Sequence, residues 1–145
     1  MRIESDTVDL VLEQHYMNGT INKYEVYYFD IFLHKKYERI GYTDLRVGHS
    51  KYLYFLGNVG YRIYEEYRGH GYAHDAAKLV LEFARKLGMD YLYITCDPDN
   101  IASKKTLDKL GGEFLGNKKV PITNPIYFEG SRRKLIYRYD LEGSE

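Results

Sequence analysis

The sequence predicts an α+β fold, in which a mixed, mostly antiparallel twisted sheet of six to seven strands carries helices on its faces. Three observations lead to this prediction. One long helical period, residues 71–87, lies between several extended segments. The short β-branched and aromatic segment Asp90–Cys96 follows that helix directly. The content of Tyr 17 against Phe 6 and Trp 0 indicates strands with faces that are partly exposed to solvent.

Length and charge limit the classes of protein. We expect one domain over residues 1–145. Lys+Arg 21 balance Asp+Glu 21, so no net charge favours nucleic acid or an anionic membrane as partner. Cys96 is the single cysteine, which excludes an internal disulfide and gives no sign of zinc. The acidic first ten residues and the lack of a long apolar run predict a cytoplasmic protein.

The first half of the chain reads as strands. Thr7–Met17 alternates and is followed by the turn signal Asn18-Gly19, and Lys35-Lys36 joins Val26–His34 to Tyr37–Val47 in a predicted hairpin. Lys51–Tyr64 is also predicted to be extended, but it is too long and too rich in glycine for one regular strand.

Two glycines in that run, Gly57 and Gly60, indicate either a β-bulge or a close approach of another backbone or a ligand. From residue 73 the apolar residues instead follow helical spacing up to Leu87, and Gly88 suits the position after the helix. With Asp90–Cys96 as the next strand, this order predicts a right-handed parallel crossover.

The last third alternates helix and strand. Asp97–Asn100 is a turn with capping residues, and a helix is predicted over Ile101–Leu110, ending at Gly111-Gly112. Glu113–Gly116 is predicted as a short strand and Lys134–Leu141 as the closing strand.

The turn RGHGYA, Arg68–Ala73, lies where a strand passes into the long helix. Gly69 and Gly71 allow the backbone to approach a diphosphate, and Arg68 adds a fixed positive charge. The turn matches neither a GxGxxG dinucleotide fingerprint nor a Walker loop. A glycine-rich helix entry without a ligand remains the alternative interpretation.

A second pattern follows the next strand. Asn100 and Ser103 lie one helical turn apart, and Asn100 also suits the N-cap of that helix. With both motifs in this order and spacing, Val59–Phe114 resembles the core of the GNAT superfamily of acyl-CoA-dependent N-acyltransferases. Lys109–Gly112 is a near match to the turn that ends this core in the family. The resemblance covers a little over a third of the chain.

The resemblance implies a V-shaped splay between the bulged fourth strand and the fifth, with pantetheine in between and the diphosphate on the N–H groups of Gly69–Ala73. Acetyl-CoA is the implied co-substrate, without a metal. The cofactor-binding residues implied are Tyr61, Arg62, Ile63, Arg68, Gly69, His70, Gly71, Tyr72, Ala73, Asn100 and Ser103.

The implied reaction is acetyl transfer to a primary amine by direct attack in a ternary complex. The amine must lose a proton to a base or through a water chain. The thioester oxyanion needs a donor, for which the resemblance points to the Ile63 N–H, with Asn100 also in the catalytic site. Proximity supplies much of the rate, so no covalent enzyme intermediate is required.

The acid and the base remain unassigned. Leu107 stands where the family often has a tyrosine that protonates the leaving thiolate. Tyr127, Tyr137 and Tyr67 are candidate replacements. For the base the candidates are Glu65, Glu66, Asp30 and Asp97, with a solvated surface carboxylate as the alternative interpretation of each. Cys96 is more typical of a small buried residue than of a nucleophile.

The acceptor side also departs from the family, because only Asn18–Tyr24 is available where early helices are usual. The acceptor site is therefore open, built by the loop Lys118–Arg133, or closed by a second subunit in a homodimer. An open site suits a peptide amine and a closed one a small-molecule amine. Two other functions remain open: a non-catalytic acyl-CoA-binding sensor or scaffold, and a structural protein whose turn binds nothing.

Overall fold

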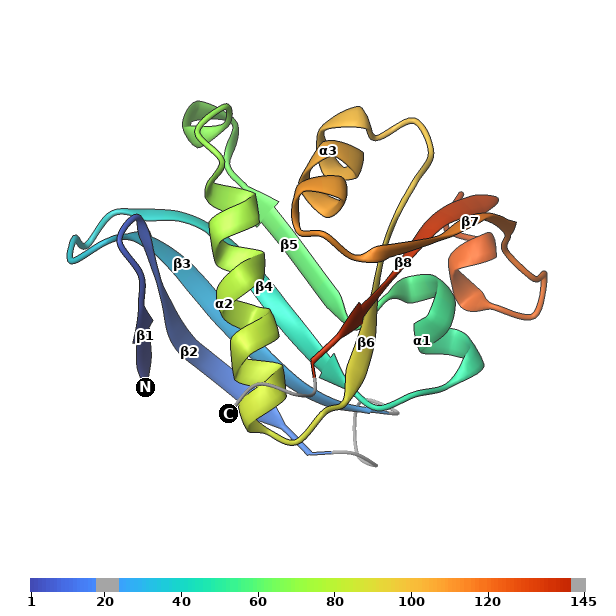
Figure 1. Cartoon of the computed structure of the whole chain (residues 1–145), viewed down its shortest axis with the longest axis horizontal. Coiled ribbons are helices and arrows are strands. Elements are labelled where there is room, and N and C mark those ends of the chain that lie inside the picture. The colour runs from blue at the N-terminus through green and yellow to red at the C-terminus, as the bar shows by residue number, and fades with distance from the viewer. Residues whose placement is uncertain (18–23, 142–145) are drawn as a thin grey trace.

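A computed structural model describes residues 1–17 and 24–141, and in these residues the strands form two antiparallel sheets (Figure 1). The first sheet has five strands in chain order: β1 (Arg2–Glu4), β2 (Val8–Tyr16), β3 (Glu25–Leu33), β4 (Arg39–Val47) and β5 (Val59–Ile63). The second has the order β6 (Tyr91–Cys96), β8 (Arg133–Asp140), β7 (Glu113–Lys119). The α+β class is confirmed, and β1 is the strand that the sequence did not predict. The predicted turn Asn18-Gly19 lies outside the described residues.

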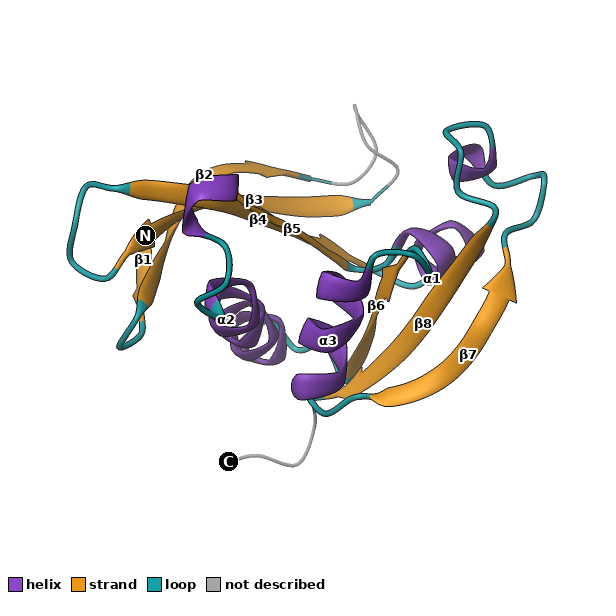
Figure 2. Cartoon of the chain, turned by 90° about the horizontal axis from the view of Figure 1, so that it is seen from above, coloured by secondary structure: helices purple, strands orange, loops and turns teal. Residues whose placement is uncertain are grey.

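The helices are α1 (Lys51–Leu56), α2 (Tyr72–Lys86) and α3 (Ile101–Lys109), with the short 3-10 helices η1 (Glu65–Tyr67) and η2 (Pro125–Tyr127). Figure 2 shows α2 against one face of the five-stranded sheet and α3 beside the three-stranded sheet. The predicted apolar face of α2 is fully buried at Ala76, Val80 and Ala84. No helix among the described residues is long and apolar enough to cross a membrane.

The prediction of an extended chain over Lys51–Tyr64 is wrong in its first half. The Ser50 hydroxyl accepts a hydrogen bond from the Leu53 N–H (3.1 Å) and so caps α1, which the glycine-focused interpretation missed. Gly57 ends this helix with φ 91°, and a Cβ there would lie 3.2 Å from the Thr95 nitrogen. The close approach predicted at this glycine is therefore real. The β4–β5 register runs without a shift, so the predicted bulge is absent from this strand pair.

Asn58 joins the two sheets where β5 begins. Its backbone N–H donates to the Tyr93 carbonyl (2.7 Å), and its side-chain oxygen accepts from the Tyr93 N–H (2.9 Å). Beyond this junction β5 and β6 run in the same direction and diverge (Figure 1), a divergence we call the splay. The splay predicted from the family is confirmed. The predicted parallel crossover therefore links two sheets rather than two strands of one sheet.

Candidate active site

The turn before α2 presents backbone donors outward. Gly69 and Gly71 have φ of 89° and 79°, values that few residues other than glycine adopt. A Cβ at either position would meet no atom within 4 Å. Gly71 is the N-cap of α2 and makes no side-chain cap hydrogen bond. The first N–H groups of a long helix are thus available to an anion, at its positive end.

Arg68 ties this turn to β5. Its Nε donates to the Ile63 carbonyl (2.9 Å), which fixes the guanidinium at the end of the strand. His70 packs on Tyr72 with ring centroids 5.3 Å apart. The one acidic residue in the first turn of α2, Asp75, accepts from the Thr7 hydroxyl (2.7 Å) on the β2 side of the helix. The predicted turn residues therefore form one exposed, basic helix entry.

Among the described residues, β5 pairs with only one strand, β4. Its other edge is unpaired and faces the splay. The Tyr64 N–H donates to the Ile40 carbonyl (2.8 Å), so alternation directs the N–H groups of Ile63 and Tyr61 away from β4. An extended amide chain laid along this edge would find these donors. The Ile63 carbonyl is occupied by Arg68.

Tyr61 and Ser103 meet across the splay, with their hydroxyl oxygens 2.8 Å apart. The thiol of Cys96, which is buried, lies near Ser103 and is influenced by it. Burial raises the pKa of Tyr61, so its phenol stays protonated at neutral pH. Burial likewise raises the pKa of Cys96, which supports the prediction that it is not a nucleophile.

The cap interpretation of Asn100 is confirmed, because its side-chain oxygen accepts from the Ser103 N–H (3.1 Å) and begins α3. Leu107, on the same helix, is fully buried. A phenol from β5, that of Tyr61, lies beside α3 instead. From the sequence, Tyr61 was expected to contribute only its backbone, since no spacing rule links it to Ser103 42 positions later.

The tyrosines predicted as alternative acids have other partners. Tyr137 donates to Asp108 (2.6 Å), and burial with this carboxylate raises the pKa of Tyr137 to about 12. Tyr67 donates to Glu38 (2.6 Å). Tyr127 lies in η2, beyond β7, with the Arg132 guanidinium over its ring. The structure does not bring these three together with Tyr61 and Ser103.

The predicted bases are dispersed as well. Glu65 and Glu66 are exposed in η1. Asp30 forms an ion pair with Arg39 (2.8 Å), and Asp97 binds Lys134 (3.0 Å) and accepts from the Ser131 hydroxyl (3.0 Å).

A carboxylate that no sequence pattern predicted, Asp44, lies on β4 directly opposite Gly60 of β5. It is paired with Arg46 at 2.8 Å, and 15% of its side chain is exposed. Burial raises the pKa of Asp44, against the opposing effect of Arg46. Only the strand register places it beside β5, which explains why composition and motifs did not identify it.

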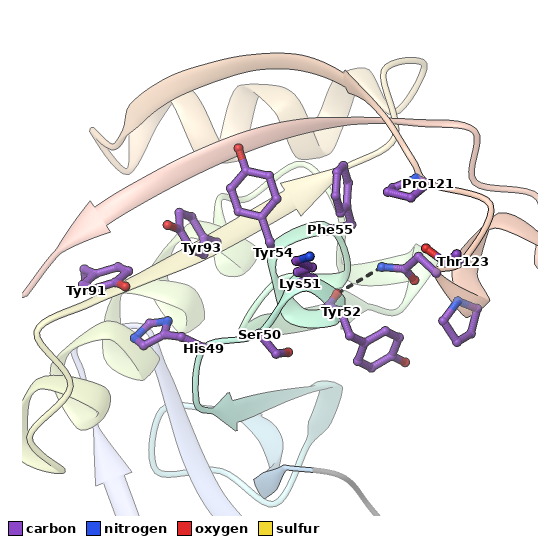
Figure 3. Close-up of a pocket in the computed structure, with 12 residues that line it drawn as sticks. His49, Ser50, Lys51, Tyr52, Tyr54, Phe55, Tyr91, Tyr93, Pro121 and Thr123 are labelled. Carbon is purple, nitrogen blue, oxygen red and sulfur yellow. Dashed lines mark hydrogen bonds between the residues drawn. The ribbon is translucent and has the colours of Figure 1, made fainter.

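A pocket of about 410 Å³ opens beside α1 and β6 (Figure 3). The rings of His49 and Tyr91 stack at 4.1 Å, and Tyr54 meets Tyr93 edge-on at 4.9 Å. Burial and the nearby Arg138 lower the pKa of His49, so this imidazole is neutral at pH 7. The lining residues are His49, Ser50, Lys51, Tyr52, Tyr54, Phe55, Tyr91, Tyr93, Pro121, Thr123, Asn124 and Pro125. Part of the loop predicted on the acceptor side thus borders an aromatic pocket. Residues 18–23, predicted to be too short for the early helices, lie outside the described part of the chain.

Comparison with known proteins is consistent with this geometry. A family model described as an acetyltransferase (GNAT) domain matches residues 2–113. The uncharacterized N-acetyltransferase YnaD of Bacillus subtilis strain 168 is 29% identical over 73 residues, which is 47% of this chain and 43% of that protein. The chain thus spans less than half the length of this curated relative.

Solved structures agree on the fold. An acetyltransferase from Agrobacterium tumefaciens str. C58 is 27% identical with a TM-score of 0.56, over 77% of this chain and 59% of that one. A ribosomal L7/L12 alpha-N-protein acetyltransferase, solved in complex with coenzyme A, has a TM-score of 0.72 at 14% identity and covers 99% of this chain and 100% of its own. In the described residues, no group of three or more His, Cys, Asp or Glu is placed to hold a metal ion.

Proposed function

Because the chain belongs to the GNAT acetyltransferase family, we propose that it transfers an acetyl group from acetyl-CoA to a primary amine by direct attack in a ternary complex. The observation that carries the proposal is the splay itself. The open edge of β5, with its outward N–H groups, begins where Asn58 joins the two sheets. It ends at the glycine-rich start of α2, where Gly71 makes no side-chain cap hydrogen bond. A long, amide-containing, diphosphate-bearing cofactor suits this combination.

In this proposal the diphosphate binds the N–H groups of residues 69–73, with Arg68 beside it. The pantetheine arm runs along the open edge of β5 and pairs with the Tyr61 N–H, while the Ser103 hydroxyl approaches the arm from α3. Support comes from the φ angles of Gly69 and Gly71 and from the open edge of β5. The coenzyme A complex of the ribosomal protein acetyltransferase, which has the same fold, adds to it.

The chemistry follows from these placements. The neutral amine attacks the thioester carbonyl, a C–N bond forms, and an N–H on the open edge of β5, that of Ile63, stabilises the oxyanion. The C–S bond then breaks, and the thiolate takes a proton from the phenol of Tyr61. On α3, Leu107 occupies the position where the family often has a tyrosine, and the phenol of Tyr61 takes over that role. The hydrogen bond to Ser103 holds this phenol at the splay. No covalent enzyme intermediate is needed.

The acceptor is a primary amine, and the catalytic interpretation is favoured over a non-catalytic acyl-CoA sensor because the relatives named above are acetyltransferases. The aromatic pocket beside α1, which includes part of the loop after β7, is available to the body of the acceptor.

Release of CoA from acetyl-CoA, measured with a panel of small and peptide amines, tests the proposal. Product must form with at least one amine, and mass spectrometry must show the N-acetyl group on that amine. Acetyl-CoA binding by calorimetry without transfer to any amine would instead favour the sensor. No shift in melting temperature with CoA would contradict both interpretations.

A further inference from the structure

The outer face of the five-stranded sheet, opposite α2, carries a row of three facing residues: Tyr28 on β3, Asp44 on β4 and Gly60 on β5. The neighbours of Asp44 in β4, Thr43 and Leu45, are buried on the α2 side. Alternation therefore places Asp44 on the outer face. This row ends at β5, the strand that borders the splay.

Gly60 leaves room for the carboxylate to extend over β5. A Cβ at this position would lie 2.6 Å from Oδ1 of Asp44 and 2.5 Å from Nη2 of Arg46. Gly60 does not have a positive φ, so its role is spatial rather than conformational. The ion pair fills the place of its missing side chain and so lies directly above the strand whose far edge faces the splay.

Arg46 fixes the position of this carboxylate. Its Nε and Nη2 donate to the two oxygens of Asp44 at 2.8 and 3.3 Å, and its Nη1 donates to the Gly57 carbonyl at 3.0 Å. The pair is therefore held from β4 and from the end of α1. A carboxylate held in this way is preorganised for one direction of approach.

Two tyrosines lie on the same side of the sheet region as this carboxylate and feel its charge. Tyr28 is its cross-strand neighbour, and the charges of Asp44 and Arg46 act on the hydroxyls of both Tyr28 and Tyr24. Tyr24 in turn stacks on Tyr52 of α1, with ring centroids 6.1 Å apart. A carboxylate with tyrosine side chains nearby is the combination that recognises an ammonium group, through an ion pair and cation–π contact.

We infer that Asp44 receives the primary ammonium of the acceptor on the outer side of β5 and takes one proton from it before attack, an inference that rests on the proposed function. Figure 2 shows α2 and α3 on the inner side of the splay, where Tyr61 and Ser103 also meet, so the proposed approach of the amine is from the outer face.

The protons balance. The ammonium gives one proton to Asp44, the nitrogen loses a second as the amide forms, Tyr61 supplies one to the thiolate, and solvent restores Tyr61 and Asp44. The net reaction releases one proton.

The titration of Asp44 supports this role. Burial raises the pKa of Asp44, and Arg46 and the Gly60 N–H act in the opposite direction. The groups that face it are Arg46 from β4, Tyr28 and Tyr24 from β3 and the segment before it, and the Gly60 N–H from β5. A carboxylate with a raised pKa is a stronger base than an exposed one, and the ion pair with Arg46 favours its ionised form.

The test uses the chain saturated with CoA and two probes of the same shape, phenethylamine and the neutral 2-phenylethanol. Calorimetry at pH 8 should show phenethylamine binding at least about tenfold more tightly than the alcohol. Asp44→Asn should remove this preference and leave the affinity for the alcohol unchanged. Gly60→Ala keeps both charges, but its methyl group occupies the place of Oδ1 of Asp44. This variant should therefore also weaken the binding of phenethylamine. Asp140→Asn is the matched control, because Asp140 pairs with Arg138 two residues away on β8, outside this site.

Kinetics test the proton transfer separately. Asp44→Asn should lower kcat/KM for phenethylamine by about 100-fold at pH 7 with the KM for acetyl-CoA unchanged. The deficit should shrink towards pH 10, where the amine is already neutral, a change that a merely structural role would not produce.

Equal affinity of the wild type for amine and alcohol would overturn the inference. So would full activity of Asp44→Asn, or equal losses in Asp44→Asn and Asp140→Asn. Binding of phenethylamine through Asp44 without any N-acetyl product would leave the ammonium site standing and contradict the proposed function instead.

Discussion

The hydroxyls of Tyr61 and Ser103 lie 2.8 Å apart, so a side chain of β5 meets α3 across the splay. Under the proposed function this phenol protonates the leaving thiolate. Tyr61→Phe should then lower kcat by about 100-fold and change the dissociation constant of acetyl-CoA by less than about threefold.

The pH profile gives a second readout of Tyr61. Because burial raises its pKa above the ordinary 10.0, the acid form persists through neutral pH, and wild-type kcat should fall only as pH rises past that value. Tyr61→Phe should lack this alkaline fall. Tyr27→Phe, which removes a hydroxyl bound to Glu25 on β3, serves as the control with activity near that of the wild type. Full activity of Tyr61→Phe would contradict the assignment.

The glycine turn allows a test in which only charge changes. Gly71→Asp and Gly71→Asn both place a side chain at a left-handed position with no neighbour within 4 Å, and both residues tolerate such a φ better than most. The carboxylate should repel the diphosphate and weaken CoA binding by roughly 100-fold relative to the amide. Isothermal titration with CoA measures the difference, and equal melting temperatures of the two variants would show that folding is not its cause. Equal affinities would refute the placement of the phosphates.

Asn58 should contribute strongly to stability because it joins the two sheets. It is fully buried, and its side chain bonds to the carbonyls of Arg46 and Gly48 and to the N–H of Tyr93. Asn58→Ala leaves these three backbone groups without a partner, and we expect a loss of about 3 kcal/mol in the free energy of unfolding. Urea denaturation measures this loss. Asn117→Ala, which removes an exposed bond to Arg133, should cost less than about 0.5 kcal/mol. Similar losses in both variants would count against the joining role.

Local patterns predicted most of the fold, and the reasons are visible in particular elements. The strands β2, β3, β4, β6 and β8 and the helices α2 and α3 follow periodicity and caps that neighbouring residues determine. The helix α1 was missed because its six residues, Lys51–Leu56, are too short for a helical period, and Ser50 was its only signal. The strand β1 has three residues and forms by pairing with β2, which no local rule reveals.

The site divides in the same way. The turn residues Arg68–Ala73 and the pair Asn100 and Ser103 carry a motif, so the sequence was sufficient to propose them. The contact of Tyr61 with Ser103 and the position of Asp44 over Gly60 depend on which strands neighbour one another and in which register. Residues far apart in sequence acquire such roles only in the folded sheet, and for that reason the acid and the base stayed unassigned.

Acid should destabilise the fold through Asp9, which is fully buried near the start of β2. Burial alone would raise its pKa, but hydrogen bonds from His34 (2.8 Å), the Lys35 N–H (2.9 Å) and Arg2 (2.9 Å) outweigh this effect and lower the pKa of Asp9 below 3.8. A carboxyl group whose folded pKa is lowered stabilises the protein above its unfolded pKa, and this contribution is lost as pH falls through the folded value.

Asp9→Asn should therefore lower the free energy of unfolding by about 3 kcal/mol at pH 7, because Arg2, His34 and the Lys35 N–H lose the charged acceptor that they share. The difference from the wild type should persist at pH 5 and shrink at pH 3, because the unfolded wild-type chain then carries a proton on Asp9 that folding has to release. Urea unfolding at the three pH values measures this trend, with Asp6→Asn, an exposed neighbour, as the control that should differ little from the wild type at pH 7. A difference that stayed constant down to pH 3 would show that Asp9 acts through its shape and not through its charge.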